Sequence, residues 1–210
     1  METLCANHNF RIALNYHTYG NLLICPWGYA PATFTPDVNT YEAWGDLLTR
    51  DNQYSFGTAD QTVGYIVNGS SDDWMYGDQT TKPKIMAMTP EAGDQADGFW
   101  PATNRIVDIC MQNIPMDLYA AKLLLAYAEV QNTDGKYVSG ANGYFHFDIQ
   151  RLGLDSPAVY TVSIQPISSE ITSVGAPRTF STLTITQTVS DSISYSVNPS
   201  TLEGTMLTYV

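Results

Sequence analysis

The sequence predicts an α/β fold followed by a small antiparallel β-sandwich-like module. Short apolar runs at 10–16, 21–25 and 84–89 alternate with segments whose apolar residues recur at helical spacing. After a polar, glycine-rich stretch, the chain changes to short β-rich segments separated by Gly, Pro, Ser and Asn. We therefore expect an α/β part at 1–130, a linker at 131–142 and a β module at 143–210.

The α/β part is expected to begin with the end of a helix at 2–9. Residues 10–16 predict a strand buried on both faces, and 21–25 predict a second strand that Pro26 stops. A loop at 29–37 then leads into a helix at 40–49. This helix is expected to have Asn39 or Thr40 as its cap and one apolar face, formed by Tyr41, Trp44, Leu47 and Leu48.

The next stretch, 54–65, is predicted to be mostly loop. Ser70 or Ser71 is expected to cap a short helix through Tyr76, and 84–89 predict a buried strand that ends just before Glu91. After Pro101, a helical stripe of apolar residues is expected to pack against the rest of the fold; it consists of Ile106, Val107, Cys110 and Ile114.

Pro115 is expected to interrupt this helix, because its ring nitrogen cannot donate a hydrogen bond, and a second helix is expected to reach about Val130. In the β module, strands are predicted at 144–149, 159–164, 182–186 and 192–197. A typical sandwich needs about 100 residues in roughly seven strands, so we expect this module to be truncated.

Composition excludes several classes of protein. The net charge of -12 and the pI of about 4.3 argue against a nucleic-acid binder, which would carry a basic face. No apolar stretch approaches the ~20 residues that span a bilayer, and the first residues lack the basic and apolar regions of a signal peptide. Cys5, Cys25 and Cys110 form no Cys-x-x-Cys pair and are expected to be small buried side chains.

Three segments carry the candidate catalytic and binding residues. The first places His17 after an apolar run, at the expected carboxyl end of a strand, where ligands bind in open α/β sheets. The second runs from Gly64 to Trp74, and the third is Thr-Pro-Glu-Ala-Gly at 89–93 followed by Gly-Phe-Trp-Pro at 98–101. Each residue alone has an ordinary structural explanation: a lone histidine is more often buried, and a lone glutamate is more often solvated.

Taken in this order, the three segments resemble the zinc metallocarboxypeptidases of the carboxypeptidase A type, especially bacterial secreted members, from about Asn7 to Val130. The resemblance implies the C-terminal portion of an α/β/α sandwich with a mixed sheet. It also implies that the family's His-x-x-Glu motif, and the arginines and asparagine that bind the substrate carboxylate, belong upstream of this chain. The implied cofactor is Zn²⁺, with one ligand in this chain.

The resemblance also assigns roles to individual residues. His17 matches a zinc ligand, and Glu91 matches the general base that activates water and then protonates the leaving amine. Tyr65 matches the mobile tyrosine that closes over the substrate's terminal carboxylate. Ala92 departs from the family, which often has a bulky apolar residue after the glutamate.

Three further residues match substrate-binding positions. Tyr19 matches a tyrosine that contacts the peptide upstream of the cleaved bond. Asp72 lies in the segment that lines the specificity pocket, where an acid would favour a C-terminal Lys or Arg, and Thr89 lines the same pocket. Asp72 and Asp73 are adjacent, however, and one of them is expected to cap or brace the short helix.

The expected activity is zinc-dependent hydrolysis of the C-terminal peptide bond of peptides or proteins, in a secreted or cell-surface protein. One ligand of three cannot hold catalytic zinc, so we expect the chain to be a fragment that is inactive alone. Two alternatives remain: a non-catalytic peptide- or glycan-binding module on a peptidase scaffold, and a structural surface protein carried by the β module. Retention of both His17 and Glu91 weighs against the first alternative, and the upstream gene would separate all three.

Overall fold

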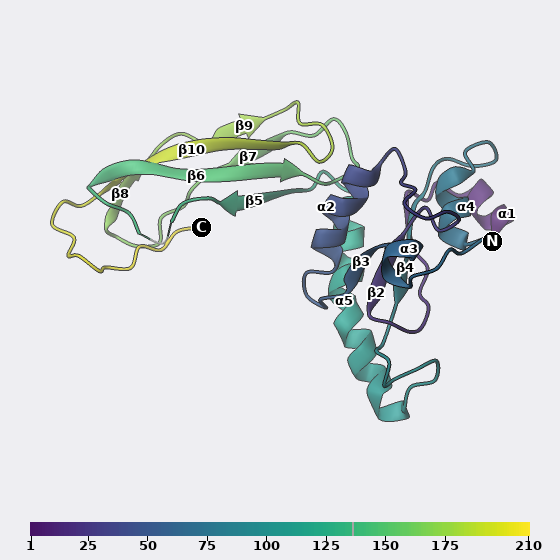
Figure 1. Cartoon of the computed structure of the whole chain (residues 1–210). Coiled ribbons are helices and arrows are strands. Elements are labelled where there is room, and N and C mark those ends of the chain that lie inside the picture. The colour runs from purple at the N-terminus through teal and green to yellow at the C-terminus, as the bar shows by residue number, and fades with distance from the viewer. Residues whose placement is uncertain (136) are drawn as a thin grey trace. The chain divides into compact units, whose positions relative to one another are not determined.

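The computed structural model describes residues 1–135 and 137–210 and divides the chain into two compact units, Met1–Leu124 and Leu125–Val210 (Figure 1). The two units are described separately below. The domain limits expected from the sequence, at 130 and 142, remain a prediction. Among the described residues, none of the helices combines the length and the apolar character needed to cross a membrane.

The first unit contains a four-stranded mixed sheet with the strand order β1-β4-β2-β3. β1 pairs with β4 in parallel, β4 with β2 antiparallel, and β2 with β3 in parallel. This confirms the predicted α/β class with a mixed sheet. Its elements are α1 (Glu2–Asn7), β1 (Ile12–Leu14), β2 (Leu22–Cys25), α2 (Val38–Leu48), β3 (Ser55–Thr58), α3 (Ala59–Thr62), α4 (Ser71–Gly77), β4 (Met86–Glu91), the 3-10 turn η1 (Thr103–Arg105) and α5 (Ile106–Leu123).

Buried strand β4 and helix α2 supply much of the core of this unit. Successive residues of a strand point to opposite faces, so Ile85 and Ala87 share one face, where they pack with Cys5 and Met75. The predicted apolar face of α2 is confirmed, because Tyr41, Trp44, Leu47 and Leu48 are all buried. The Tyr41 hydroxyl also donates to the Ala87 carbonyl (3.3 Å), which fixes the tyrosine ring against the sheet.

Several boundaries differ from the prediction. Strand β1 is half-buried rather than buried on both faces, because it is the last strand of the described sheet and pairs only with β4. The stretch 54–65 holds β3 and α3 instead of a continuous loop. The local signal for α3 is a capping box in which Thr58 and Gln61 exchange hydrogen bonds. Helix α2 begins after Asp37, not at Asn39 or Thr40.

Helix α5 is one continuous helix, with Pro115 inside it, and it ends at Leu123 rather than near Val130. The predicted packing stripe is wrong: Val107 is 67% exposed and Cys110 also faces solvent. The carbonyl that Pro115 leaves without an intrahelical donor belongs to exposed Met111, where water can bind it. The buried face is instead formed by Ile109, Asn113, Met116, Ala120 and Leu123.

The second unit is the predicted antiparallel β module. One sheet has the order β5-β6-β10-β8, and a two-stranded sheet pairs β7 with β9. Side chains of both sheets share a core in which Phe147, Ile149 and Ile193 pack against Tyr160 and Phe180, as expected for a sandwich. The strands are β5 (Ala128–Asn132), β6 (Asn142–Arg151), β7 (Tyr160–Val162), β8 (Ile171–Val174), β9 (Arg178–Phe180) and β10 (Thr188–Val197).

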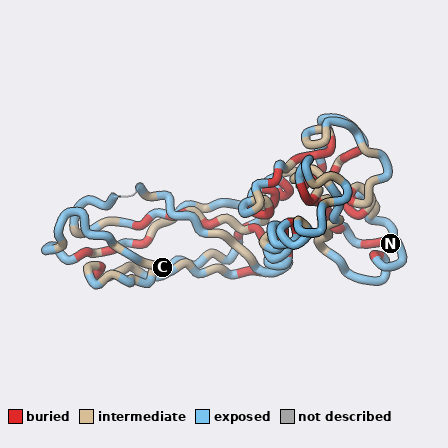
Figure 2. Tube along the Cα trace, turned by 90° about the horizontal axis from the view of Figure 1, so that it is seen from below, coloured by how far each residue is buried: buried red, intermediate tan, exposed pale blue. Residues whose placement is uncertain are grey.

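Burial alternates along the long strands of this unit, as Figure 2 shows in the change between red and pale segments. Residues 128–130, predicted to be helical, lie in β5, and 182–186 do not form a strand. Leu183 in that stretch nevertheless enters the core, which explains its apolar character. His146 points to solvent as expected, and its Nδ1 lies 2.7 Å from an Asp134 carboxylate oxygen.

Candidate functional site

The clearest constellation is the pair His17 and Glu91. The parallel register of β1 and β4 sets Ile12 opposite Met86, and this offset continues beyond β1 to an isolated bridge between His17 and Glu91. The bridge is held by His17 N–H donating to the Pro90 carbonyl (2.9 Å) and by Ala92 N–H donating to the His17 carbonyl (2.9 Å). Residues opposite each other in a sheet point to the same face, so the imidazole and the carboxylate emerge side by side.

The environments of the two side chains differ. His17 is exposed, whereas Glu91, the last residue of β4, is half-buried. Burial raises the pKa of Glu91, and positive charge on nearby His17 opposes that rise. A carboxylate with a raised pKa is a stronger base, and a position beside an exposed imidazole leaves it open to a water molecule or a substrate.

Adjacent Asp72 and Asp73 have different surroundings. Asp72 is buried in α4, with 4% of its surface exposed, and its carboxylate accepts from Asp73 N–H (3.1 Å). The Asp73 carboxylate accepts from Gly28 N–H through both oxygens, at 2.9 and 3.1 Å. Burial, followed by the charge of Asp72, raises the pKa of Asp73 despite these bonds. Asp73 therefore braces α4 against the loop at 26–29, while Ser70 caps the helix.

Gly28 joins three segments of the site. Its N–H binds Asp73, and its carbonyl accepts from Val67 N–H (2.8 Å), in the loop that carries Tyr65. A side chain at position 28 would lie 3.3 Å from the Val67 carbonyl oxygen, so glycine allows the two loops to approach closely. The sequence did not predict this junction, for which the Asp-Asp doublet after Ser71 is the local signal.

The remaining predicted residues lie around the same sheet edge or on nearby loops. Thr89 is in β4 opposite Ile24, two residues before Glu91 and therefore on the same face of the strand. The Tyr19 ring packs edge-on against Phe99, with 5.0 Å between centroids, a contact that the sequence did not indicate. Tyr65 is 63% exposed on the loop between α3 and α4. The structure thus brings His17, Glu91 and Thr89 together and leaves Tyr65 in solvent.

Comparison with known proteins identifies the family to which the chain belongs. A family model described as zinc carboxypeptidase matches residues 1–116, more than half of the chain. The chain belongs to the zinc carboxypeptidase family. Carboxypeptidase B of Astacus astacus is 30% identical to it, over 47% of this chain and 33% of that protein. This zinc carboxypeptidase chain therefore spans about a third of the length of that relative, and the match to the family ends within the first unit.

The donor set can be tested against the zinc that the family uses. Among residues 1–135 and 137–210, no group of three or more His, Cys, Asp or Glu side chains could hold a metal ion. A catalytic zinc commonly has three protein ligands, such as the two histidines and one glutamate of carboxypeptidase A. One exposed histidine could supply at most one ligand of such a site, and the described residues do not complete it.

Proposed function

We propose that this chain is the C-terminal part of a zinc-dependent metallocarboxypeptidase that hydrolyses the last peptide bond of peptides or proteins. The parallel bridge between His17 and Glu91 carries the proposal, because it sets a metal-binding side chain beside a carboxylate whose pKa is raised by burial. Family membership supports the reaction class. The protein is proposed to be secreted or attached to the cell surface, with the other zinc ligands on an upstream segment.

The roles of the two residues follow from their positions. His17 would donate one imidazole nitrogen to zinc, which when bound lowers the pKa of a water ligand to about 7. Glu91 accepts a proton from the water that attacks the scissile carbonyl and returns it to the nitrogen of the leaving amino acid. Burial raises the pKa of Glu91, which makes it a better proton acceptor than a fully solvated carboxylate.

Three other residues are proposed to bind the substrate, and Tyr65 is proposed to act with Glu91 at the reacting centre. Buried Asp72 would pair with the side chain of a C-terminal Lys or Arg, an interaction strengthened by low solvent access. Thr89 would line the same pocket, and Tyr19 would contact the peptide on the other side of the cleaved bond. Exposed Tyr65 would close over the substrate and donate a hydrogen bond from its phenol to the scissile amide or to the terminal carboxylate.

Mutation of Glu91 in the full-length protein that carries this chain tests the proposal. Glu91→Gln keeps the shape and removes the base, so kcat should fall by about 10²–10⁴ while KM changes little. Glu203→Gln, on an exposed turn of the β module, is the matched control and should leave both constants unchanged. Hydrolysis is followed with peptides ending in Lys or Leu, and Asp72→Asn should reduce the preference for Lys.

Two results would redirect the proposal. Full activity of Glu91→Gln would remove Glu91 from the mechanism. A wild-type full-length protein that binds peptides but cleaves none would favour the non-catalytic binding module instead. For this chain alone we expect no activity and no tight zinc binding. Calorimetric titration that found stoichiometric zinc binding at micromolar affinity would contradict the assignment of His17 as its single ligand.

A further inference from the structure

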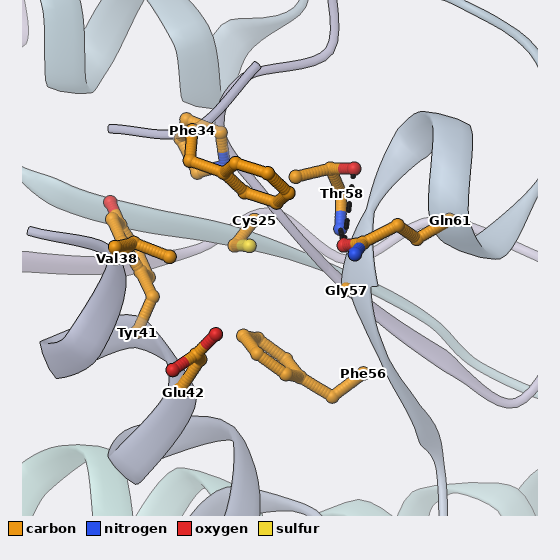
Figure 3. A pocket seen from close by; sticks show the side chains of 10 residues that line it. Cys25, Phe34, Val38, Tyr41, Glu42, Phe56, Gly57, Thr58 and Gln61 are labelled. Carbon is orange, nitrogen blue, oxygen red and sulfur yellow. Dashed lines mark hydrogen bonds between the residues drawn. The ribbon is translucent and has the colours of Figure 1, made fainter. Parts of the chain in front are cut away.

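A small cavity lies apart from the residues assigned above to catalysis and to peptide binding. Its volume is about 120 Å³, and it opens at the carboxyl ends of the parallel strands β2 and β3, next to the first half of α2 (Figure 3). Crevices at the carboxyl ends of strands are common ligand sites in α/β folds. The cavity is lined by Cys25, Pro26, Phe34, Val38, Tyr41, Glu42, Phe56, Gly57, Thr58 and Gln61.

This cavity is distinct from the His17–Glu91 site. Glu91 lies opposite Leu22, at the start of β2, whereas Cys25 ends that strand and pairs with Thr58 of β3. Three residues of strand correspond to about 10 Å. None of the residues assigned above to catalysis or to peptide binding lines the cavity.

Aromatic rings form much of the cavity wall. Figure 3 shows Phe34 and Phe56 on opposite sides of the space, with Tyr41 and Val38 on a third side. The Tyr41 ring is fixed by its hydroxyl, which donates to the Ala87 carbonyl. Phe56 packs closely on Gly45 of α2, where an added side-chain carbon would lie 2.4 Å from the ring. At least two of the three rings are therefore held in place before any ligand arrives.

Glu42 gives the cavity its charge. It is the one ionisable carboxylate among the ten lining residues, none of which is basic, and Figure 3 shows it pointing toward the space between the rings. Two other polar side chains of the lining interact with each other, because Gln61 Oε1 accepts from the Thr58 N–H (2.9 Å) and from the Thr58 hydroxyl (3.3 Å). Burial, together with the charges of Asp72, Glu42 and Asp73, raises the pKa of the Cys25 thiol to about 12, so the thiol is neutral.

The combination of rings and one carboxylate selects a type of ligand. Aromatic faces attract cations, and cages of such rings are used to bind methylated ammonium groups. Anions are disfavoured by Glu42 and its acidic neighbours. Metal ions prefer several oxygen, nitrogen or thiolate donors, which a single carboxylate does not supply. Pockets for drug-sized ligands measure about 300–1,000 Å³, so this smaller space suits a small head group.

We propose that this cavity binds a small organic cation, an ammonium group that carries methyl or short alkyl substituents. The alkyl groups contact the faces of Phe34, Tyr41 and Phe56, and Glu42 balances the charge. This site is independent of the peptidase assignment, because it shares no residue with it.

Titration of the chain with choline, followed by calorimetry or ligand-observed NMR at about 0.15 M salt, tests the proposal; this salt concentration screens non-specific attraction to the acidic surface. The comparison ligand is 3,3-dimethylbutan-1-ol, which has the same shape without the charge. Choline should bind saturably and about tenfold or more tightly than the alcohol. Equal affinities, or no saturable binding of choline, would overturn the proposal.

Two variants locate the site. Glu42→Gln removes the charge at constant shape, and Phe34→Leu removes a ring that is 46% exposed and so contributes little to the core. Each should weaken choline binding several-fold without changing the thermal midpoint. Asp46→Asn is the matched control, because it removes the same charge from an exposed position of α2 one turn later, outside the cavity. An equal loss in Asp46→Asn would show that choline senses only the net charge, which would refute the site.

Discussion

Replacing Met116 by Ala tests which face of α5 belongs to the core. Met116 is completely buried, and its truncation removes three heavy atoms from a region where neighbouring backbone cannot easily collapse. Substitutions of this kind cost about 2–5 kcal/mol. Small domains are stable by about 5–15 kcal/mol, so the loss would be a large fraction of the total.

Ile114→Ala is the control, because Ile114 lies two residues earlier and is 43% exposed. It should cost less than about 1 kcal/mol, since much of the side chain is already in water. Urea unfolding followed by circular dichroism gives both values as shifts of the midpoint, provided that the slope m stays constant. If Ile114→Ala destabilised the protein as much as Met116→Ala, the stripe expected from the sequence would be the packing face and the orientation of α5 described here would be wrong.

Two further substitutions probe the same unit. Gly45→Ala should destabilise the chain despite a gain in helix propensity of about 1 kcal/mol, because overpacking against the Phe56 ring costs about 1–3 kcal/mol. Phe56→Leu should relieve that cost in the double mutant, and additive urea-unfolding energies would contradict the clash. Burial opposes ionisation of Asp37, but hydrogen bonds from Lys84 and Tyr76 prevail and lower its pKa. Its stabilisation is therefore present at neutral pH and lost as pH falls below about 4. Asp37→Asn should reduce stability at pH 7 by about 1 kcal/mol or less, and equal differences from wild type at pH 7 and pH 3 would refute this.

The sequence placed His17 and Glu91 at one sheet edge more accurately than it placed the packing face of α5. His17 and Glu91 could be placed together because each follows an apolar run that ends in a polar residue, and parallel strands bring such ends to one edge. Their partners in the loops could not be found, because the bonds from Gly28 to Asp73 and Val67 depend on how three separate segments approach one another. No local pattern encodes that approach.

Helix α5 shows why periodicity alone was insufficient. Its apolar residues occupy two faces, one that includes Val107 and Ile114 and another that includes Ile109 and Met116, and both follow helical spacing. Packing decides between them, and the sequence contains no direct record of the packing partner. The prediction that Cys110 is buried is wrong for the same reason, because it places the wrong face of α5 against the core. Pro115 predicts a break, yet α5 continues through it, and the carbonyl left without a donor is on exposed Met111, where water can bind it.

Two acidic residues near the end of β2 support two different proposals, one for peptide specificity and one for binding of a small cation. Asp72 is buried within α4 and is assigned to a basic side chain of the peptide, whereas Glu42 is on α2 and is assigned to a small organic cation. The charges of both carboxylates raise the pKa of the Cys25 thiol, so both contribute to the same region of negative potential. A general attraction for cations would make Asp72→Asn and Glu42→Gln weaken both ligands alike. Two separate sites require the opposite pattern: Asp72→Asn alters only the preference for peptides ending in Lys, and Glu42→Gln alters only choline binding.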